Sequence, residues 1–404
     1  MSSATLHPSR SLTDREVTKL TLPAVAFTFV AYLSIGAPLA LLPSYLHLGL
    51  GLSTVIAGLI VSAQYIATFA SRPLAGHMSD VRGPKVTVRY GLLLGALSGL
   101  LIVTAHLAQR TMWLGLSLLI LSRLALGAGE SLTSTGATMW GIGRVGVDHT
   151  ARVISWNGVA TYTALAVGAP LGTLLGERWG FWSVGAMIMA ICLGSYVAAE
   201  RMAPTAAAKG KRAPMGGILL RVMPYGAGLA LGGMGFGVIA TFIALYFAQA
   251  GWQGAPLSLT IYGLCFVGVR LLFPGVIARY GGFTVTLVSL AVELAGLAML
   301  GLTHTHALAY VASGLTGLGF SLVFPALGVE AAKAFPASVR GAVLGVYTAF
   351  VDLSLFLSGP LAGAVIRSHG YGAAFLATAG MVLVALLVVG TMAISVRSKT
   401  AISS

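Results

Sequence analysis

The sequence predicts an all-α membrane protein with twelve transmembrane helices in two pseudo-symmetric six-helix halves. Of its 404 residues, 57% are hydrophobic and only 8% are charged, whereas a soluble domain carries about 25% charged residues. So little charge could not cover the surface of a chain this long in water, which excludes a soluble enzyme, a disordered tail and a disulfide scaffold. The 53 glycines show no collagen-like period and suit membrane helices, which approach closely at small residues.

Twelve apolar segments follow one another along the chain, and a helix that crosses a bilayer needs about 20 such residues. Most segments are bounded by charge, Gly or Pro, as helix ends usually are. None alternates apolar and polar residues as a barrel strand does. The first segment is too long for the apolar region of a signal peptide. The expected spans are 22–46, 53–75, 86–108, 112–138, 151–175, 180–200, 217–248, 256–278, 283–303, 307–332, 341–366 and 371–395.

The basic residues predict the orientation of these spans. With twelve spans, both termini and the even-numbered loops share one side, which carries 20 of the 24 Lys and Arg residues. The other side carries three, Arg110, Arg178 and Arg367, and Arg123 lies within a span. Cytoplasmic loops carry the excess of basic residues, so we expect both termini in the cytoplasm. Because the charge is spread over many short loops, the net +14 does not indicate nucleic-acid binding.

The two halves repeat each other. The longest polar connection separates an N-terminal half, 1–200, from a C-terminal half, 217–404, with a cytoplasmic linker at 201–216. Four landmarks recur with an offset of 190 residues: Gly127 and Gly317, Gly129 and Gly319, Pro170 and Pro360, Gly180 and Gly370. Transporters built from such repeats bind their substrate between the halves near mid-membrane.

A short motif between the second and third spans resembles the loop motif of the major facilitator superfamily, G-x-x-x-D-[RK]-x-G-[RK]-[RK]. Val81 and Pro84 stand at two of its basic positions, and a degenerate copy covers 275–282. The resemblance implies a gating element in which Asp80 clamps neighbouring helix ends. Gly76 and Gly83 would allow close packing and a tight turn. The gating residues are Arg72, Gly76, Asp80, Gly83 and Lys85.

Further segments resemble the same superfamily. Residues 123–129, from Arg123, resemble its fourth-helix arginine motif. Gly168, Pro170 and Gly172 resemble its fifth-helix motif associated with antiporters, with Ala169 interrupting the Gly-Pro pair. Segments at 237–242, 270–274, 319–328 and 352–354 resemble bacterial inner-membrane transporters of the YhhS/YfcJ type. The resemblance implies a multi-pass protein of the bacterial inner (plasma) membrane and leaves the substrate open.

Among the charged side chains inside the expected spans, four stand out: Arg123, Glu130, Glu293 and Asp352. Each costs about 2.5–3.5 kcal/mol on insertion scales, so each is a functional candidate. Asp352 lies close to mid-membrane, where a low dielectric favours a neutral carboxyl and suits reversible protonation. The alternative is a carboxyl that only holds two helices together. For Glu293, in a peripheral span, we expect a structural pair.

Arg123 and Glu130 are seven residues apart, which separates them by about 10.5 Å along one helix. Each therefore needs a partner on another helix, and the lumen between the halves is the expected place. The resemblance implies a proton-related role for Arg123. For both Arg123 and Glu130 the alternative is structural pairing. Asp352, Glu130 and Arg123 are thus the candidates for proton coupling or the central site.

Other polar residues could face the lumen. Asn157 is the only asparagine in the chain, and an interhelical hydrogen bond is favoured over substrate contact. A G-x-G-x-x-G pattern at 141–146 has no preceding strand and does not indicate dinucleotide binding, and His304 with His306 is a weak metal pattern. The remaining lumen candidates are Tyr32, Gln64, Tyr162, Tyr246, Tyr262 and Tyr347.

These observations favour a secondary transporter over an enzyme, with no cofactor and no metal. A membrane-embedded enzyme would need several His, Asp or Glu side chains at one depth, and no nucleotide-binding lysine motif is present. We expect proton-coupled efflux (antiport) of a small or amphipathic compound by alternating access. The alternative is proton-coupled uptake of a sugar or organic acid by symport. The expected partners are the substrate, protons and the lipid bilayer, with no nucleic acid, and the protein is expected to be a monomer.

Overall fold

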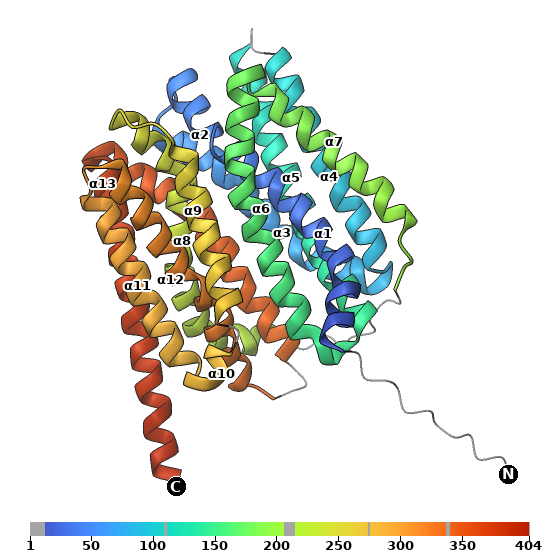
Figure 1. The fold of residues 1–404 in the computed structure, drawn as a ribbon, viewed down its shortest axis with the longest axis vertical. Coiled ribbons are helices and arrows are strands. Elements are labelled where there is room, and N and C mark those ends of the chain that lie inside the picture. Colours follow the sequence, from blue (N-terminus) through green and yellow to red (C-terminus); the bar gives the residue numbers. More distant parts are fainter. Residues whose placement is uncertain (1–12, 109–110, 206–214, 274, 337–339, 404) are drawn as a thin grey trace, which may run out of the picture.

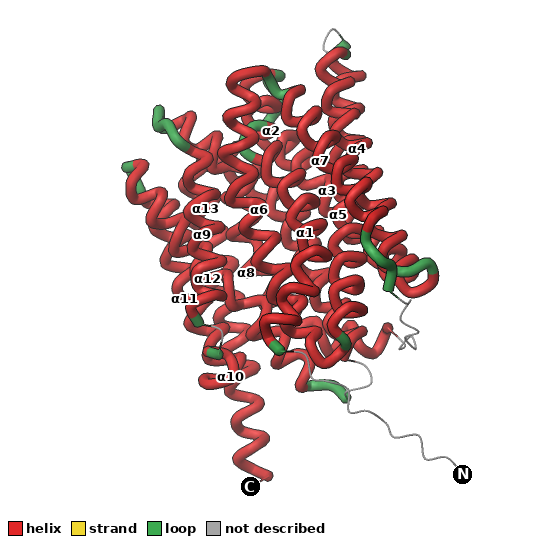
Figure 2. The backbone as a smooth tube through the Cα atoms, turned by 45° about the vertical axis from the view of Figure 1, so that its right-hand side comes forward, coloured by secondary structure: helices red, strands yellow, loops and turns green. Residues whose placement is uncertain are grey.

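A computed structural model describes residues 13–108, 111–205, 215–273, 275–336 and 340–403. Within these ranges every regular element is a helix, and the long helices run side by side in one bundle (Figures 1 and 2). The first half contains α1 (Asp14–Leu39), α2 (Leu42–Ser44), a π-helical turn (Tyr45–Gly49), α3 (Thr54–Val81), α4 (Pro84–Leu107), α5 (Met112–Val145), α6 (Thr150–Trp179) and α7 (Trp182–Arg201). The second contains α8 (Met215–Gln249), α9 (Ala255–Leu272), α10 (Val276–Tyr280), α11 (Gly282–Leu302), α12 (His306–Lys333) and α13 (Arg340–Ser403).

The described residues contain eleven helical segments long and apolar enough to cross a membrane. The last of these, Val343–Val396, has 54 residues and holds two of the expected spans. They meet at Gly370, whose backbone is not helical (φ 83°). The predicted all-α fold with twelve spans is confirmed.

Helix ends follow local chemistry. Thr13 caps α1 by accepting a hydrogen bond from the amide of Glu16, whose side chain accepts one from the amide of Thr13, so the pair forms a capping box. Ser53 caps α3 by accepting from the amide of Ile56. Pro84 occupies the first turn of α4, where its missing N–H costs nothing.

Several predicted span ends were wrong, among them the end at residue 138, since α5 continues to Val145. The sequence predicted an end at residue 75, but α3 continues through Pro73 to Val81. Proline is tolerated inside membrane helices because neighbouring groups satisfy the freed backbone atoms. The span expected at 256–278 is instead α9, which ends at Leu272, followed by the short α10.

Two contact regions join the halves, and we call them the α3–α13 seam and the α6–α9 seam. In the first, Thr54 Oγ1 donates to the carbonyl of Gly363 at 3.0 Å, and Gly58 lies against the backbone of Gly359. In the second, Thr260 Oγ1 donates to the carbonyl of Ala166 at 2.9 Å. These contacts lie toward the side where α3 begins, which we call the far side.

The opposite side, where α1 begins and α13 ends, is called the terminus side (Figure 1). Here the α3–α13 seam is loose. Gly76 follows Arg72 by one turn, and Gly345 precedes Asp352 by two turns, so they share the helix faces of those residues. Among the described residues, a Cβ added at Gly76 or Gly345 would meet no atom within 4 Å. The α3–α13 seam is therefore closely packed on the far side and loose on the terminus side, whereas the α6–α9 seam stays in contact toward the terminus side, where Gly158 lies against Arg270.

The internal repeat is present in the backbone. Gly180 and Gly370, 190 residues apart, both have positive φ, 88° and 83°. Gly83 and Gly281 also have positive φ, 91° and 81°, and each precedes a membrane helix, but their separation is 198 residues. The offset is thus 198 for α3 and α4 and 190 for α5 and α6.

Helix contacts confirm the two offsets. A Cβ at Gly127 would collide with the backbone of Gln64, and a Cβ at Gly317 would collide with the backbone of Tyr262. Gly127 and Gly317 differ by 190 residues, whereas Gln64 and Tyr262 differ by 198. The same close crossing, of α5 over α3 and of α12 over α9, therefore occurs in each half.

Candidate functional site

An ion pair crosses the α3–α13 seam. Arg72 binds Asp352 through two hydrogen bonds, one from Nη2 to Oδ1 at 2.8 Å and one from Nε to Oδ2. The Asp352 side chain is 5% exposed and that of Arg72 is 23% exposed. A bidentate arginine–carboxylate pair is among the stronger hydrogen-bonded contacts in proteins, and this one joins residues from different halves.

Glu130 of α5 completes a polar group that we call the central cluster: Tyr32, Thr68, Arg72, Glu130 and Asp352. The carboxylate of Glu130 accepts hydrogen bonds from Tyr32 at 2.9 Å, Thr68 at 2.8 Å and Ser134 at 3.3 Å. It also interacts electrostatically with Arg72 and Asp352. The cluster contains two carboxyl groups and one guanidinium, so it has a net negative charge unless one carboxyl binds a proton.

Arg123 does not join this cluster. It is fully buried and binds Gln64 Oε1 of α3. Among the residues that the structure describes, its Nε and Nη1 atoms and the Nε2 atom of Gln64 have no hydrogen-bond partner. As predicted, Arg123 and Glu130 bind residues of other helices rather than each other. Arg123, however, lies in the contact between α3 and α5 of one half, and its role stays a prediction.

The prediction of a structural pair for Glu293 was wrong. Its side chain is fully buried, and neither carboxyl oxygen has a hydrogen-bond partner among the described residues. The carboxyl lies against Gly235 of α8, where a Cβ would come within 2.6 Å of Oε1. A charged carboxylate buried without a partner is strongly disfavoured.

The five gating residues do not form one group. Arg72 lies inside α3 and faces α13, whereas Asp80 is exposed near the end of α3, and no ion pair of Asp80 is found in the described ranges. Lys85 Nζ donates to the carbonyls of Glu200 at 2.7 Å and Met202 at 2.9 Å. It therefore ties α4 to the end of α7, within the first half.

The antiporter-type motif lies where α6 packs on α1. A Cβ at Gly168 would come within 2.9 Å of the backbone nitrogen of Ala37, and one at Gly172 would overlap the Ala37 carbonyl. Pro170 lies between them inside the helix. The glycines permit this close approach, and the link to antiport stays a prediction.

The structure places the remaining lumen candidates in different surroundings. Asn157 accepts a hydrogen bond from Thr28 of α1 at 2.5 Å, as the interhelical interpretation predicted. The hydroxyl of Tyr246 donates to the carbonyl of Thr303, and that of Tyr347 donates to the carbonyl of Phe324, both at 3.0 Å. These two bonds lie inside the second half rather than at either seam.

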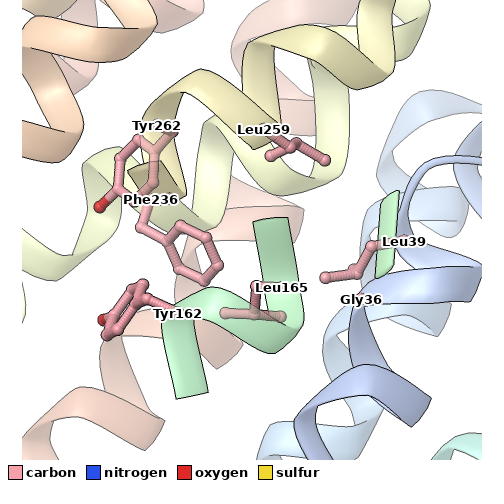
Figure 3. A pocket seen from close by; sticks show the side chains of 8 residues that line it. Gly36, Leu39, Tyr162, Leu165, Phe236, Leu259 and Tyr262 are labelled. Atoms are coloured by element: carbon pink, nitrogen blue, oxygen red, sulfur yellow. The ribbon is translucent and has the colours of Figure 1, made fainter. Parts of the chain in front are cut away.

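Tyr162 and Tyr262 belong to an aromatic cluster at the α6–α9 seam, together with Phe236 and Phe266. Tyr162 stacks on Phe266 with ring centroids 3.4 Å apart, and Phe236 lies 5.2 Å from Tyr262. Figure 3 shows three of these rings around a cavity closed by residues of α1, with both tyrosine hydroxyls pointing away from Leu39. At about 10 Å³ the cavity has room for about one water molecule.

Arg270 is a site residue that the sequence analysis missed, because it was counted among the basic residues of the loops. It lies within α9 and donates from Nε at 3.2 Å and Nη2 at 3.1 Å to the carbonyl of Ser321. Its guanidinium carbon lies 4.7 Å from the ring centre of Phe266. The separation of 198 residues from Arg72 was the available sign in the sequence.

The chain is similar to known transporters over most of its length. A sequence profile described as the Major Facilitator Superfamily matches residues 24–359. An uncharacterised MFS-type transporter of Burkholderia mallei (strain SAVP1) is 50% identical over 88% of this chain and 87% of its own. The uncharacterised MFS-type transporter YhhS of Shigella flexneri is 47% identical over 90% of each chain. The crystal structure of a mutant of the nucleoside transporter NupG, at 16% identity, covers 92% of this chain and 99% of its own with a TM-score of 0.74.

Proposed function

The chain belongs to the Major Facilitator Superfamily, and from this premise we propose that it is a proton-coupled exporter of a small or amphipathic compound. Its two halves, 1–200 and 217–404, rock about the central cluster, and the linker 201–216 joins them. The terminus side, which carries most basic residues, faces the cytoplasm. The far side faces the outside of the bacterial inner membrane.

The observation that carries this proposal is the ion pair between Arg72 and Asp352 across the α3–α13 seam. With Glu130 nearby, two carboxyl groups share one guanidinium, so binding one proton restores charge balance. A proton on Asp352 cancels the charge that holds Arg72 and leaves Arg72 to balance Glu130. Protonation therefore weakens a contact between the halves.

In this proposal, binding of a proton and binding of the substrate compete, and exchange follows from that competition. In the conformation described, the α3–α13 seam is closed on the far side and the ion pair is formed, which corresponds to the proton-free state. Substrate enters once the terminus side has opened to the cytoplasm, and the halves then reorient. Outside, protonation of the cluster favours substrate release and return of the carrier. If proton and substrate instead bound together, the same site would drive uptake of a sugar or organic acid.

The proposal is tested by proton movement in everted membrane vesicles that contain the protein. An energised pH gradient is challenged with a panel of drugs, sugars and organic acids. We expect one class of compound to dissipate the gradient with the unaltered protein and not with Asp352→Asn. Glu177→Gln, which neutralises an exposed carboxylate outside the cluster, is the matched control and should behave as the unaltered protein.

Asp352→Asn should still bind the active compound and carry out its counterflow, because that exchange moves no net proton. Gradient dissipation by Asp352→Asn at the unaltered rate would refute the coupling role of Asp352. Proton-linked uptake in intact cells, without a response in everted vesicles, would replace efflux by symport.

A further inference from the structure

The two arginines at the seams are equivalent positions of the internal repeat. Arg72 of α3 and Arg270 of α9 are 198 residues apart, the offset that also relates Gln64 to Tyr262 at the same close helix crossing. Asp352 of α13, the partner of Arg72, is related by the offset of 190 to Tyr162 of α6. The repeat therefore places a tyrosine where the second arginine would find its carboxylate.

Arg270 is accordingly a cation without an anion. Its hydrogen bonds go to one carbonyl, that of Ser321, and in the described part of the chain no carboxylate forms an ion pair with it. It interacts electrostatically with the phenols of Tyr162 and Tyr262. Arg270 is partly buried, and taking a guanidinium even partly out of water is costly unless an anion compensates its charge.

The surroundings of Arg270 suit an anion that carries an apolar group. Its Nη1 atom lies against Gly158 of α6, where the missing Cβ leaves room for the guanidinium in this position. Phe266 and Tyr162 stack next to the guanidinium, and the buried hydroxyl of Tyr262 has no hydrogen-bond partner in the part of the chain that the structure describes. Arginine forks bind carboxylates and phosphates well, and aromatic rings pack on apolar groups.

We propose that Arg270 binds the anionic group of the transported compound and that the aromatic cluster holds its apolar part, so the substrate is an amphipathic organic anion. The substrate would supply the negative charge that Asp352 supplies at the other seam. The inference rests on the proposed transport function and names its substrate class.

The charge requirement is tested by binding to the purified protein in detergent, measured by calorimetry with three probes of similar shape. The probes are 3-phenylpropionate, its neutral amide 3-phenylpropionamide and the cation 3-phenylpropylammonium. We expect the carboxylate to bind at least about tenfold more tightly than the amide, because a hydrogen bond to a charged group contributes about 1.5–3 kcal/mol. Arg270→Gln should remove this preference, and Arg270→Lys should keep part of it.

A second variant restores the missing carboxylate. Tyr162→Asp places an acid opposite Arg270, as Asp352 lies opposite Arg72, and should neutralise the site from within. Tyr162→Asn removes the same aromatic ring and adds no charge. We expect Tyr162→Asp to bind 3-phenylpropionate at least about tenfold more weakly than Tyr162→Asn. Size-exclusion elution and melting temperature check that each variant is folded.

Equal affinity for the carboxylate and the amide, absence of carboxylate binding at millimolar concentration, or a preference unaffected by Arg270→Gln would each overturn the inference. Its failure is distinguishable from failure of the proposed function. Binding of 3-phenylpropionate through Arg270 without proton movement in vesicles would leave the inference standing and refute the coupling. Proton-driven exchange of a cation, at a rate that Arg270→Gln does not change, would refute the inference and leave the proposed function standing.

Discussion

At the scale of single residues, the four charged side chains predicted inside the membrane are stabilised to very different extents. Asp352 has an ion pair and Glu130 has three hydroxyl donors. Arg123 has a single hydrogen-bond acceptor in the described ranges, the amide oxygen of Gln64. Neither oxygen of Glu293 has a hydrogen-bond partner there. An unpaired buried charge destabilises a fold, so Arg123 is retained at a cost in stability and is a candidate for function.

Replacing Arg123 by methionine tests this explanation. Two guanidinium nitrogens without partners in the described ranges cost about 1–3 kcal/mol each, and Arg123→Met removes both while taking away the partner of one further atom, Gln64 Oε1. We expect Arg123→Met to melt no lower than the unaltered protein and to exchange substrate at least about tenfold more slowly. Arg72→Met, the comparison, leaves Asp352 unpaired, which costs about 3–5 kcal/mol. A lower melting temperature for Arg123→Met than for Arg72→Met would show that Arg123 serves stability.

At the scale of helices, glycine residues determine how closely two helices approach each other at a seam. Gly58 of α3 and Gly359 of α13 bring two backbones into contact near the far side. Small residues have this role in membrane proteins, where van der Waals packing rather than the hydrophobic effect joins helices. Toward the terminus side the same two helices carry Gly76 and Gly345 beside open space. One pair of helices is therefore closed at one end and open at the other.

Added methyl groups should distinguish the two ends. A Cβ at Gly359 would lie 2.6 Å from the carbonyl oxygen of Gly58, and a backbone atom cannot move aside as a side chain can. We expect Gly359→Ala to slow exchange at least about tenfold, since the far side no longer closes. Gly345→Ala, on the same helix, should exchange at the unaltered rate. Equal rates for the two variants in vesicles would contradict the assignment of the seal.

Helix number followed from the sequence because apolar runs of sufficient length admit no other structure in a bilayer. The exact helix ends and the partners of the charged side chains could not be predicted from the sequence. The span was predicted to end at residue 75 and Arg72 was assigned to a gating element, whereas α3 continues to Val81 and aims Arg72 at Asp352. The two partners are 280 residues apart, and their contact depends on α3 and α13 being neighbours. Local sequence holds no information on that adjacency.

At the scale of the whole molecule, the backbone repeats more faithfully than the charges do. The glycine turns and helix crossings recur in both halves, while Asp352 in one seam corresponds to Tyr162 in the other. A symmetric scaffold gives two conformations of similar energy, because each half can close on either side. The unequal charges allow ligands to favour one of them, since a ligand shifts an equilibrium only by its differential affinity for the two states.

A covalent link across the far side tests alternating access directly. The hydrogen bond from Thr260 to the carbonyl of Ala166 measures 2.9 Å, so the two backbones lie within reach of a disulfide, which needs Cα atoms about 4.4–6.8 Å apart. The test variant carries Ala166→Cys and Thr260→Cys, with Cys192→Ala and Cys265→Ala removing the native thiols. Oxidation should stop exchange, and reduction should restore it, because the carrier must open this side once in every cycle. A protease site inserted between the halves reports the link, since the cut halves stay together on a gel only when oxidised. Exchange at the full rate by the linked protein would refute rocking of the halves, because no route to the far side would then depend on separating α6 from α9.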